Sequence, residues 1–203
     1  MWETKIKMEI SNKEELKRII KSERSIYLSS KGGYQEFLKI VKSHPDYNAW
    51  LYTKQLRRTS YYYLKRNRNP FNAVLYLFAC RKMNRLGRRC GIECGENVFD
   101  EGVRFFHTQG TVINGNARVG KNCRLYGNNC IGNDGIHSEC PVIGDNVRIC
   151  VGAKIIGDVS IANNVIVAAG AVVNKDCLEE GVILAGIPAK IIGSVSSSKE
   201  FLD

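Results

Sequence analysis

The sequence lacks any hydrophobic run long enough for a membrane-spanning helix, which needs about 20 apolar residues. The longest candidate, from Phe71 to Cys80, is too short and contains Asn72. The N-terminus also lacks the apolar core and the small-residue cleavage site of a secretory signal peptide. We therefore expect a cytoplasmic protein, with the inner face of the membrane as the alternative location.

Patterns typical of metal sites and disulfides are missing as well. The eight cysteines include no C-x-x-C pair, and Cys90-x3-Cys94 is a poor zinc signal without a second pair. Without a signal peptide, we interpret the cysteines as reduced thiols that mostly act as small buried apolar groups. We expect no metal. The chain has three histidines for acid–base chemistry, His44, His107 and His137.

Charge is distributed unevenly along the chain. Residues 1–91 hold 21 Lys and Arg against 7 Asp and Glu, whereas residues 92–203 hold 9 and 13. The basic half permits nucleic-acid binding by composition alone, but no recognition motif accompanies it, so we expect no nucleic-acid partner. Two alternatives remain open: a patch facing anionic lipid or a lipid-linked sugar, with peripheral membrane contact, and a solvated face balanced by the acidic half of a neighbouring subunit.

The basic half is predicted to be helical. Ser11-Asn-Lys-Glu resembles a capping box that opens a helix reaching about Lys21. Further helices are expected over residues 34–42, 45–67 and 71–86, the last one capped by Gly87.

The second half follows a six-residue rule. An aliphatic side chain recurs at every sixth position, and four residues after each of the first five stands Val or Ala; the six aliphatic positions are Ile143, Ile149, Ile155, Ile161, Val167 and Val173. This period is neither the alternation of an ordinary sheet nor the helical 3.6, and hexapeptide repeats are typical of a parallel β-helix. Three short strands then make one coil, and each aliphatic side chain points inward and stacks on its copy in the next coil.

The predicted fold class is therefore α+β, a helical region followed by a left-handed parallel β-helix. We expect a basic helical region over residues 1–90, the β-helix over residues 91–193 and a polar tail over residues 194–203. The repeat is interrupted twice. Eight residues separate Thr111 from Val119, and an extruded loop lies between Ile131 and Ile143. Loops inserted into a solenoid often carry function.

Several segments, in order and at matching spacing, resemble the serine acetyltransferase family of hexapeptide acyltransferases. They are His107-Thr-Gln-Gly-Thr-Val-Ile-Asn, Pro141-Val-Ile-Gly-Asp-Asn-Val, Val151-Gly-Ala-Lys-Ile-Ile-Gly, Ala169-Gly-Ala-Val-Val and Ala185-Gly-Ile-Pro-Ala-Lys-Ile-Ile. The resemblance covers about residues 85–193. It implies acetyl-CoA as co-substrate and a homotrimer, with a dimer of trimers as a further option, whose active sites lie between adjacent β-helices.

The resemblance also implies roles for individual residues. His107 aligns with the family's catalytic base, and imidazole is suited to take a hydroxyl proton near neutral pH. Residues expected to hold acetyl-CoA are Val151, Gly152, Ala169 and Gly170 through the backbone, and Lys154 and Lys190 as phosphate partners. The ordinary alternative for His107 is a structural histidine, and for Lys154 and Lys190 it is an exposed lysine on a solenoid face.

The sequence departs from the family where the acceptor binds. Phe106 stands where the family has Asp before its histidine, and a second Asp, which orients that histidine, falls near Gly91 or Ile92. Glu139-Cys140 replaces an Arg-His pair that helps to hold the amino-acid substrate. We expect His137, Glu139 and Cys140 to contact the acceptor, and His137 is the second candidate base.

Three functions follow as hypotheses. The departures favour an O-acetyltransferase acting on a sugar hydroxyl, small or lipid-linked, in surface polysaccharide synthesis. The same chemistry on L-serine, feeding cysteine synthesis, is the alternative. A non-catalytic β-helix that serves as a scaffold or binding module is the alternative of another class.

Overall fold

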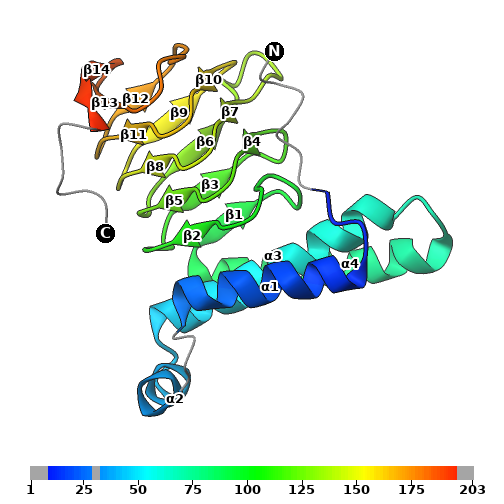
Figure 1. Ribbon diagram of the computed structural model, residues 1–203. Helices are drawn as coiled ribbons and strands as arrows, with labels where there is room; N and C mark the ends of the chain where they lie inside the picture. Colours follow the sequence, from blue (N-terminus) through cyan, green and yellow to red (C-terminus); the bar gives the residue numbers. More distant parts are fainter. Residues whose placement is uncertain (1–8, 29–32, 196–203) are drawn as a thin grey trace.

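In the computed structural model, residues 9–28 and 33–195 are described, and they form a helical base beneath a stack of β-coils (Figure 1). The helices are α1 (Lys13–Tyr27), α2 (Tyr34–Val41), α3 (Pro45–Lys65) and α4 (Pro70–Cys90). Helices α1, α3 and α4 lie side by side under the first coil, and α2 projects from one end (Figure 1). Within the described ranges, no helix has the length and hydropathy of a membrane span.

The start of α1 differs by one residue from the predicted capping box. Asn12 is the cap, because its Oδ1 accepts a hydrogen bond from the Glu15 N–H (2.8 Å), while the Glu15 carboxylate accepts one from the Ser11 N–H (2.8 Å). The predicted end near Lys21 is wrong. The helix continues because Glu23 and Tyr27 extend its buried face by two further turns.

The predicted end of α4 at Gly87 is also wrong. Gly87 lies inside the helix, and a Cβ added there would approach the Ile92 carbonyl oxygen to 2.5 Å. The cap is Gly91, whose φ of 71° lies in the left-handed region. Gly87 therefore allows α4 to pack closely against the first strand.

The coils are built from three parallel sheets. The five-stranded sheet has the order β1-β3-β6-β9-β12, the three-stranded sheet β10-β7-β4, and the six-stranded sheet β14-β13-β11-β8-β5-β2. Only β14 is antiparallel to its neighbour. The bounds are β1 Ile92–Cys94, β2 Arg104–Phe105, β3 Thr111–Ile113, β4 Arg118–Val119, β5 Arg124–Leu125, β6 Cys130–Gly132, β7 Val142–Ile143, β8 Arg148–Ile149, β9 Lys154–Ile156, β10 Ser160–Ile161, β11 Ile166–Val167, β12 Val172–Val173, β13 Val182–Gly186 and β14 Ala189–Ser194.

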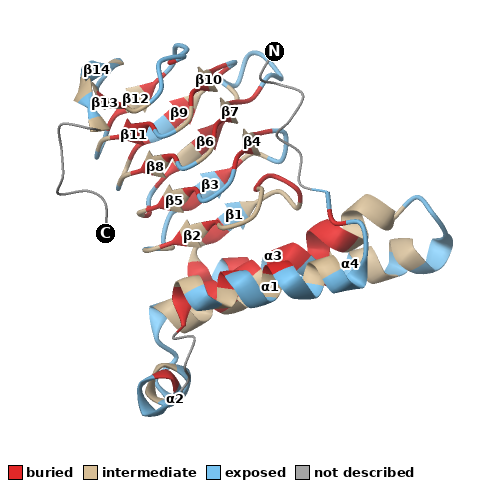
Figure 2. Ribbon diagram, viewed as in Figure 1, coloured by how far each residue is buried: buried red, intermediate tan, exposed pale blue. Residues whose placement is uncertain are grey.

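The six-residue aliphatic positions form the interior of the column. Ile143 pairs in register with Ile161, Ile149 with Val167, and Ile155 with Val173, so each stacks on its counterpart in the next coil. All six side chains are buried, and Figure 2 shows the buried residues along the inside of the stack. The predicted fold class, a helical region followed by a parallel β-helix of hexapeptide repeats, is confirmed.

One predicted interruption is misplaced. Ile113, not Thr111, stacks on Ile131, so the six-residue spacing already runs from Ile113 through Val119. Phe105 pairs with Leu125, and Ile113 pairs with Ile131. The chain therefore advances eight residues from Phe105 to Ile113 but six residues from Leu125 to Ile131. The two additional residues fall in the corner that contains His107.

A ladder of asparagines marks another corner of the column. Asn122, Asn146 and Asn164 have φ values of 57°, 59° and 60°, a conformation that asparagine tolerates better than most residues. The Nδ2 of Asn122 donates to Oδ1 of Asn146 (3.0 Å), and the Nδ2 of Asn146 donates to Oδ1 of Asn164 (3.1 Å). The ladder joins one coil to the next at the side-chain level.

A buried ion pair joins the helical base to the first coil. The Arg57 guanidinium on α3 donates to both carboxylate oxygens of Glu23 on α1 at 2.6–3.0 Å, and both side chains are buried. Arg57 also donates to the carbonyl oxygens of Phe99 (2.7 Å) and Asp100 (2.6 Å), and Glu23 accepts from the Gly102 N–H (2.8 Å). The pair therefore holds the chain that leads into β2.

Candidate active site

His107 lies at the corner between the six-stranded and the five-stranded sheets, two residues after β2, and is exposed. Phe106 before it stacks on Tyr126 of the next coil, with ring centroids 4.5 Å apart and the planes 4° from parallel, and the Arg104 guanidinium lies 4.1 Å from the Phe106 ring centroid. Phe106 thus fixes the corner by packing.

Gly127 in the next coil makes room for His107. Its φ is 93°, and a Cβ added there would approach both the Cβ and the carbonyl oxygen of His107 to 2.9 Å. The absence of a side chain at residue 127 and the longer corner together leave the His107 imidazole at the surface of the column.

The residues predicted to hold acetyl-CoA through the backbone lie at the same corner, in the coils that follow. The Gly152 N–H donates to the Gly127 carbonyl (3.0 Å), and the Gly170 N–H donates to the Val151 carbonyl (2.9 Å). These two N–H groups are therefore already engaged in hydrogen bonds between neighbouring coils. Val151 and Ala169 are exposed residues, and their N–H groups have no hydrogen-bond partner within residues 9–28 and 33–195.

The two predicted phosphate partners lie on different sheets. Lys154 begins β9 directly after the Val151 corner, and Lys190 lies on the antiparallel β14, in register with Ala185. Both are exposed, and neither forms an ion pair within the described part of the chain. Of the two lysines, Lys154 therefore lies nearer in sequence to Val151, which occupies the same corner as His107.

Asp134 connects residues within the extruded loop. Its carboxylate accepts hydrogen bonds from the N–H groups of Ile136 (2.9 Å) and His137 (2.7 Å) and contacts Nδ1 of His137 at 2.8 Å. These bonds lower the pKa of Asp134 well below its usual value, and the hydrogen bond and charge of Asp134 raise the pKa of His137. A raised pKa keeps more of the imidazole protonated at neutral pH, which weakens His137 as a general base.

Cys140 lies at the end of this loop. Burial raises the pKa of its thiol, and the thiol donates a long hydrogen bond to the Ser138 carbonyl (Sγ to O, 3.7 Å). All eight cysteines are free, and four of them, including Cys140, are buried. The geometry gives Cys140 a packing role, because a neutral buried thiol is a poor nucleophile.

The structure does not bring the loop to His107 within one chain. His107, Val151 and Ala169 lie where the six-stranded sheet leads into the five-stranded sheet, whereas the loop with His137 and Glu139 leaves the far ends of the five-stranded sheet toward β7. The strands of the five-stranded sheet separate the two sets. A site that contains both sets needs a second chain.

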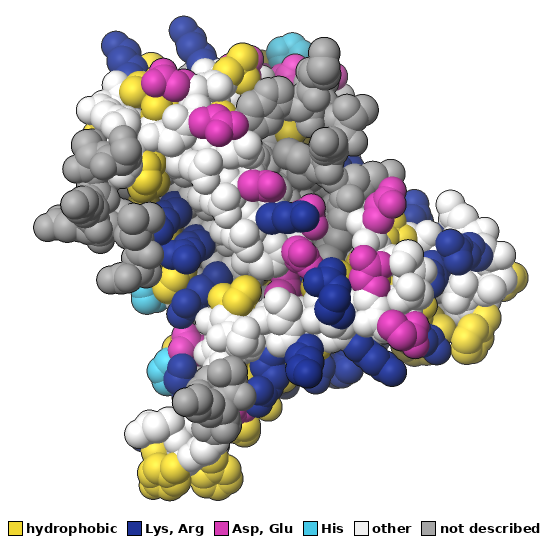
Figure 3. All heavy atoms as spheres, viewed as in Figure 1, with side chains coloured by type: hydrophobic (Ala, Val, Ile, Leu, Met, Phe, Trp, Pro, Cys, Tyr) yellow, Lys and Arg dark blue, Asp and Glu magenta, His cyan; other side chains and the backbone are white. Residues whose placement is uncertain are grey.

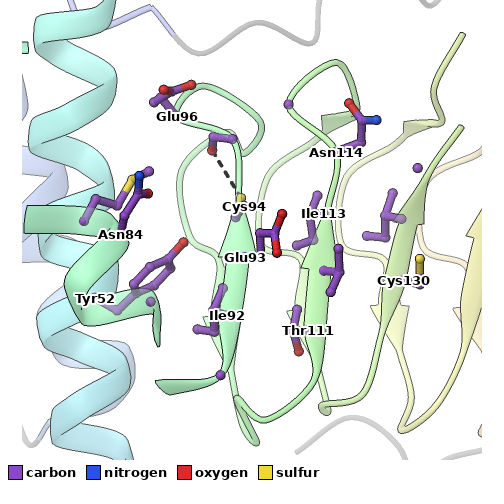
Figure 4. Close-up of a pocket in the computed structure, with 18 of the residues that line it drawn as sticks. Tyr52, Asn84, Ile92, Glu93, Cys94, Glu96, Thr111, Ile113, Asn114 and Cys130 are labelled. Atoms are coloured by element: carbon purple, nitrogen blue, oxygen red, sulfur yellow. Dashed lines mark hydrogen bonds between the residues drawn. The ribbon is translucent and has the colours of Figure 1, made fainter. Parts of the chain in front are cut away.

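A cleft of about 930 Å³ lies between α4 and the outer face of the five-stranded sheet (Figure 4). Its polar side chains include Tyr52, Asn84, Glu93 and Asn114. Glu93 is exposed on β1 and was not among the residues predicted from the sequence. Its signal was an acidic residue between two apolar ones, Ile92 and Cys94, in a strand that faces the core on one side.

The position predicted for the orienting Asp holds no carboxylate. Gly91 caps α4 and Ile92 is buried. The acidic side chain next to them in sequence is Glu93, whose backbone pairs with Val112 on the strand that follows the His107 corner.

Comparison with known proteins agrees with this architecture. Residues 140–175 match the family described as Bacterial transferase hexapeptide (six repeats). A serine acetyltransferase from Synechococcus elongatus is 33% identical over 104 residues, covering 50% of this chain and 40% of that protein. A serine acetyltransferase from Mycobacterium tuberculosis is 34% identical over 101 residues, covering 48% and 44%. The matched part thus spans less than half of these curated relatives.

Two solved structures share the fold over most of the chain. Neisseria gonorrhoeae serine acetyltransferase superposes with a TM-score of 0.69 at 21% identity, covering 90% of this chain and 68% of that one. Brucella abortus serine acetyltransferase in complex with coenzyme A superposes with a TM-score of 0.64 at 23% identity, covering 89% and 68%. The β-helix of this chain is thus a hexapeptide-repeat fold of the bacterial transferase type, similar in sequence and architecture to that of serine acetyltransferases.

Proposed function

We propose that the protein transfers an acetyl group from acetyl-CoA to a hydroxyl group, with His107 as the general base. One observation carries this proposal. The exposed imidazole and the free amides of Val151 and Ala169 share one corner of the column. A base at one end of this line, with unpaired amides in the coils beyond it, suits an extended thioester donor that lies along the corner and presents its carbonyl to the base.

The chemistry follows from these groups. The unprotonated His107 takes the proton of the acceptor hydroxyl as its oxygen attacks the thioester carbonyl. The tetrahedral intermediate carries negative charge on the former carbonyl oxygen, which a backbone N–H stabilises. Its collapse breaks the carbon–sulfur bond, and the thiolate of CoA takes the proton back from His107. The products are the acetyl ester and free CoA.

Two further observations support acetyl-CoA as the acetyl donor. The Brucella abortus serine acetyltransferase, which shares this fold, was solved in complex with coenzyme A. In this chain, Lys154 and Lys190 are exposed cations without carboxylate partners in the described residues, as phosphate partners must be.

L-serine is the first acceptor to test, because the curated relatives are named serine acetyltransferases. They give no support to the polysaccharide branch that the sequence favoured. A sugar hydroxyl remains the second candidate on one observation. The loop of residues 133–141 holds no Lys or Arg, and its one histidine, His137, already contacts the Asp134 carboxylate. A free cation for the carboxylate of serine is therefore missing from this loop.

We also propose a homotrimer, with a dimer of trimers as a larger form. The loop and the His107 corner lie on opposite sides of the five-stranded sheet, so packing of columns side by side is the simplest way to join them. Light scattering of the purified protein measures this mass directly.

The decisive assay follows thiol release from acetyl-CoA, first with L-serine and then with a panel of sugars. His107→Ala should lower kcat by about 10²–10⁴-fold while the affinity for CoA stays the same. Full activity of that variant would show that the base is another residue. If the wild-type protein neither binds acetyl-CoA nor releases thiol with any acceptor, the chain is a scaffold or binding module instead.

A further inference from the structure

The helical base carries an unusual excess of positive charge. Between Asp46 and Glu93 the chain contains 11 Lys and Arg residues and no Asp or Glu. Arg57 is buried in the ion pair with Glu23, but Arg58 on α3 and Lys82, Arg85 and Arg89 on α4 are exposed. Acetyl transfer at the His107 corner makes no use of these side chains.

Two of these cations, Arg58 and Lys82, border a groove between α1 and α4. The groove has a volume of about 500 Å³, with Leu16, Ile20 and Phe78 among its apolar residues and Lys17, Arg58 and Lys82 among its basic ones. Phe78 and Lys82 also line a second hollow along α4, together with Arg85 and Arg89. The two hollows therefore form one continuous surface, which we call the basic face.

The positive charges of the basic face are not balanced by carboxylates. Burial, and then the charges of Arg58, Lys82 and Arg24, lower the pKa of Lys54. Neither Arg58 nor Lys82 forms an ion pair within residues 9–28 and 33–195, whereas Arg24 pairs with Glu36. Cations that repel one another without a partner favour an anionic ligand.

Large apolar side chains also project from the helical base, and one of them, Phe78, lies in the basic face itself. Phe71 and Phe78 on α4 are 69% and 68% exposed, and Phe37 on α2 is 59% exposed. Figure 3 shows Lys and Arg along the edge of the helical base that lies away from the β-helix, with hydrophobic side chains at α2 and at the end where α3 turns into α4. Cations between protruding aromatic groups are typical of proteins that bind the interfacial region of a bilayer.

We propose that the basic face docks the protein onto an anionic phospholipid bilayer. The cations lie against the lipid phosphates, and Phe37, Phe71 and Phe78 insert between the headgroups. A second copy of the chain is the poorer occupant, because a two-fold contact through this face would set one group of unpaired cations against another. A nucleic-acid duplex would satisfy the cations but leave the projecting phenylalanines without a partner, because its bases are stacked on one another.

The test is co-sedimentation with vesicles of phosphatidylglycerol mixed with phosphatidylcholine, and with vesicles of phosphatidylcholine alone. Wild-type protein should sediment with the mixed vesicles only, and less as salt is raised, because salt screens these charges. Each cation near an anionic surface strengthens binding by about fivefold. Arg58→Gln combined with Lys82→Gln should therefore weaken binding by about 25-fold.

Matched controls come from the β-helix. Lys121→Gln combined with Lys175→Gln removes two exposed cations that lie outside the basic face and should leave binding unchanged. Phe71→Ser combined with Phe78→Ser should weaken binding, whereas Leu178→Ser, at a residue 63% exposed on the β-helix, should not. Circular dichroism confirms that each variant is folded.

Three results would overturn the proposal. The first is no sedimentation of the wild-type protein with anionic vesicles. The second is equal loss of binding in the control variants. The third is a larger assembly in lipid-free solution that Arg58→Gln with Lys82→Gln dissociates, because this result makes the basic face a contact between copies. Lipid binding is measured without acetyl-CoA, so it fails or succeeds independently of the proposed acetyl transfer.

Discussion

Removing the Glu23 carboxylate should destabilise the protein far more than removing an exposed ion pair that α1 forms with the first coil. In Glu23→Ala, the Arg57 guanidinium stays buried at 0% exposure without its carboxylate, and the Gly102 N–H loses its acceptor. Breaking one side of a buried pair costs about 3–5 kcal/mol. We expect the free energy of unfolding to fall by that amount.

The chain supplies a matched comparison. Arg18 on α1 forms an ion pair with Glu101 of the first coil at 3.0 Å, but these side chains are 58% and 32% exposed. Exposed pairs contribute about 0–1 kcal/mol, so Arg18→Ala should have a small effect. Glu23→Gln, which keeps an oxygen acceptor, should fall between the two variants.

Urea unfolding followed by circular dichroism, at one protein concentration, measures all three variants. The midpoint should move with little change in the slope, because the surface exposed on unfolding stays similar. Equal destabilisation by Glu23→Ala and Arg18→Ala would refute the reasoning, since burial is the main difference between the two pairs.

Three further predictions test the column, the loop and the asparagine ladder. Ile155→Ala should cost about 2–5 kcal/mol of unfolding free energy by urea titration, because its side chain is fully buried in the stack, and the same change at the half-buried Ile156 should cost less. The raised pKa of His137 means that its contact with Asp134 stabilises the loop below the ordinary histidine value of about 6.5 and loses this effect as pH rises through the folded pKa. In Asp134→Asn, an NMR titration of His137 should therefore give a midpoint near 6.5, while the pH dependence of acetyl transfer stays unchanged; a shift in the latter would make His137 the base. At Asn146, with φ of 59°, replacement by Ala should destabilise more than replacement by Gly by about 1 kcal/mol, and an equal effect of both would show that only the ladder bonds matter.

The column was predictable because its rule is local and repeated. Aliphatic residues six apart identify the interior positions, and residues 18 apart, such as Val151 and Ala169, must share a corner when every side has six residues. The six-residue spacing does not hold in the segment before Ile113. There the corner with His107 is two residues longer, and the sequence does not show which side of the coil holds the additional residues.

The helical base was predictable in number but not in detail. Four helices were expected and four are present in the described residues, yet two ends were wrong, because tertiary packing decided them. Glu23 extends α1 through its contact with Arg57, 34 residues away, and Gly87 serves the approach of α4 to β1 rather than a cap. Neither contact leaves a periodic signal in the sequence.

The site was predictable only in part, for a similar reason. The resemblance predicts His107 as the base, and this stays a prediction. The location of the loop on another edge of the column depends on which sheet each strand joins, and the sequence does not show that. Glu93 was missed because a single acidic residue on a strand is indistinguishable from a solvated side chain until the cleft beside it is known.

The asparagine ladder has a consequence for how such a chain can change. Asn122 and Asn146 are 24 residues apart and Asn146 and Asn164 are 18 apart, yet the two side-chain bonds are nearly equal at 3.0 and 3.1 Å. The turn with the extruded loop therefore holds six more residues than its neighbour without disturbing the stacking. The exposed residues 134–139 can therefore change in length and composition while Cys140 stays packed and the column keeps its geometry.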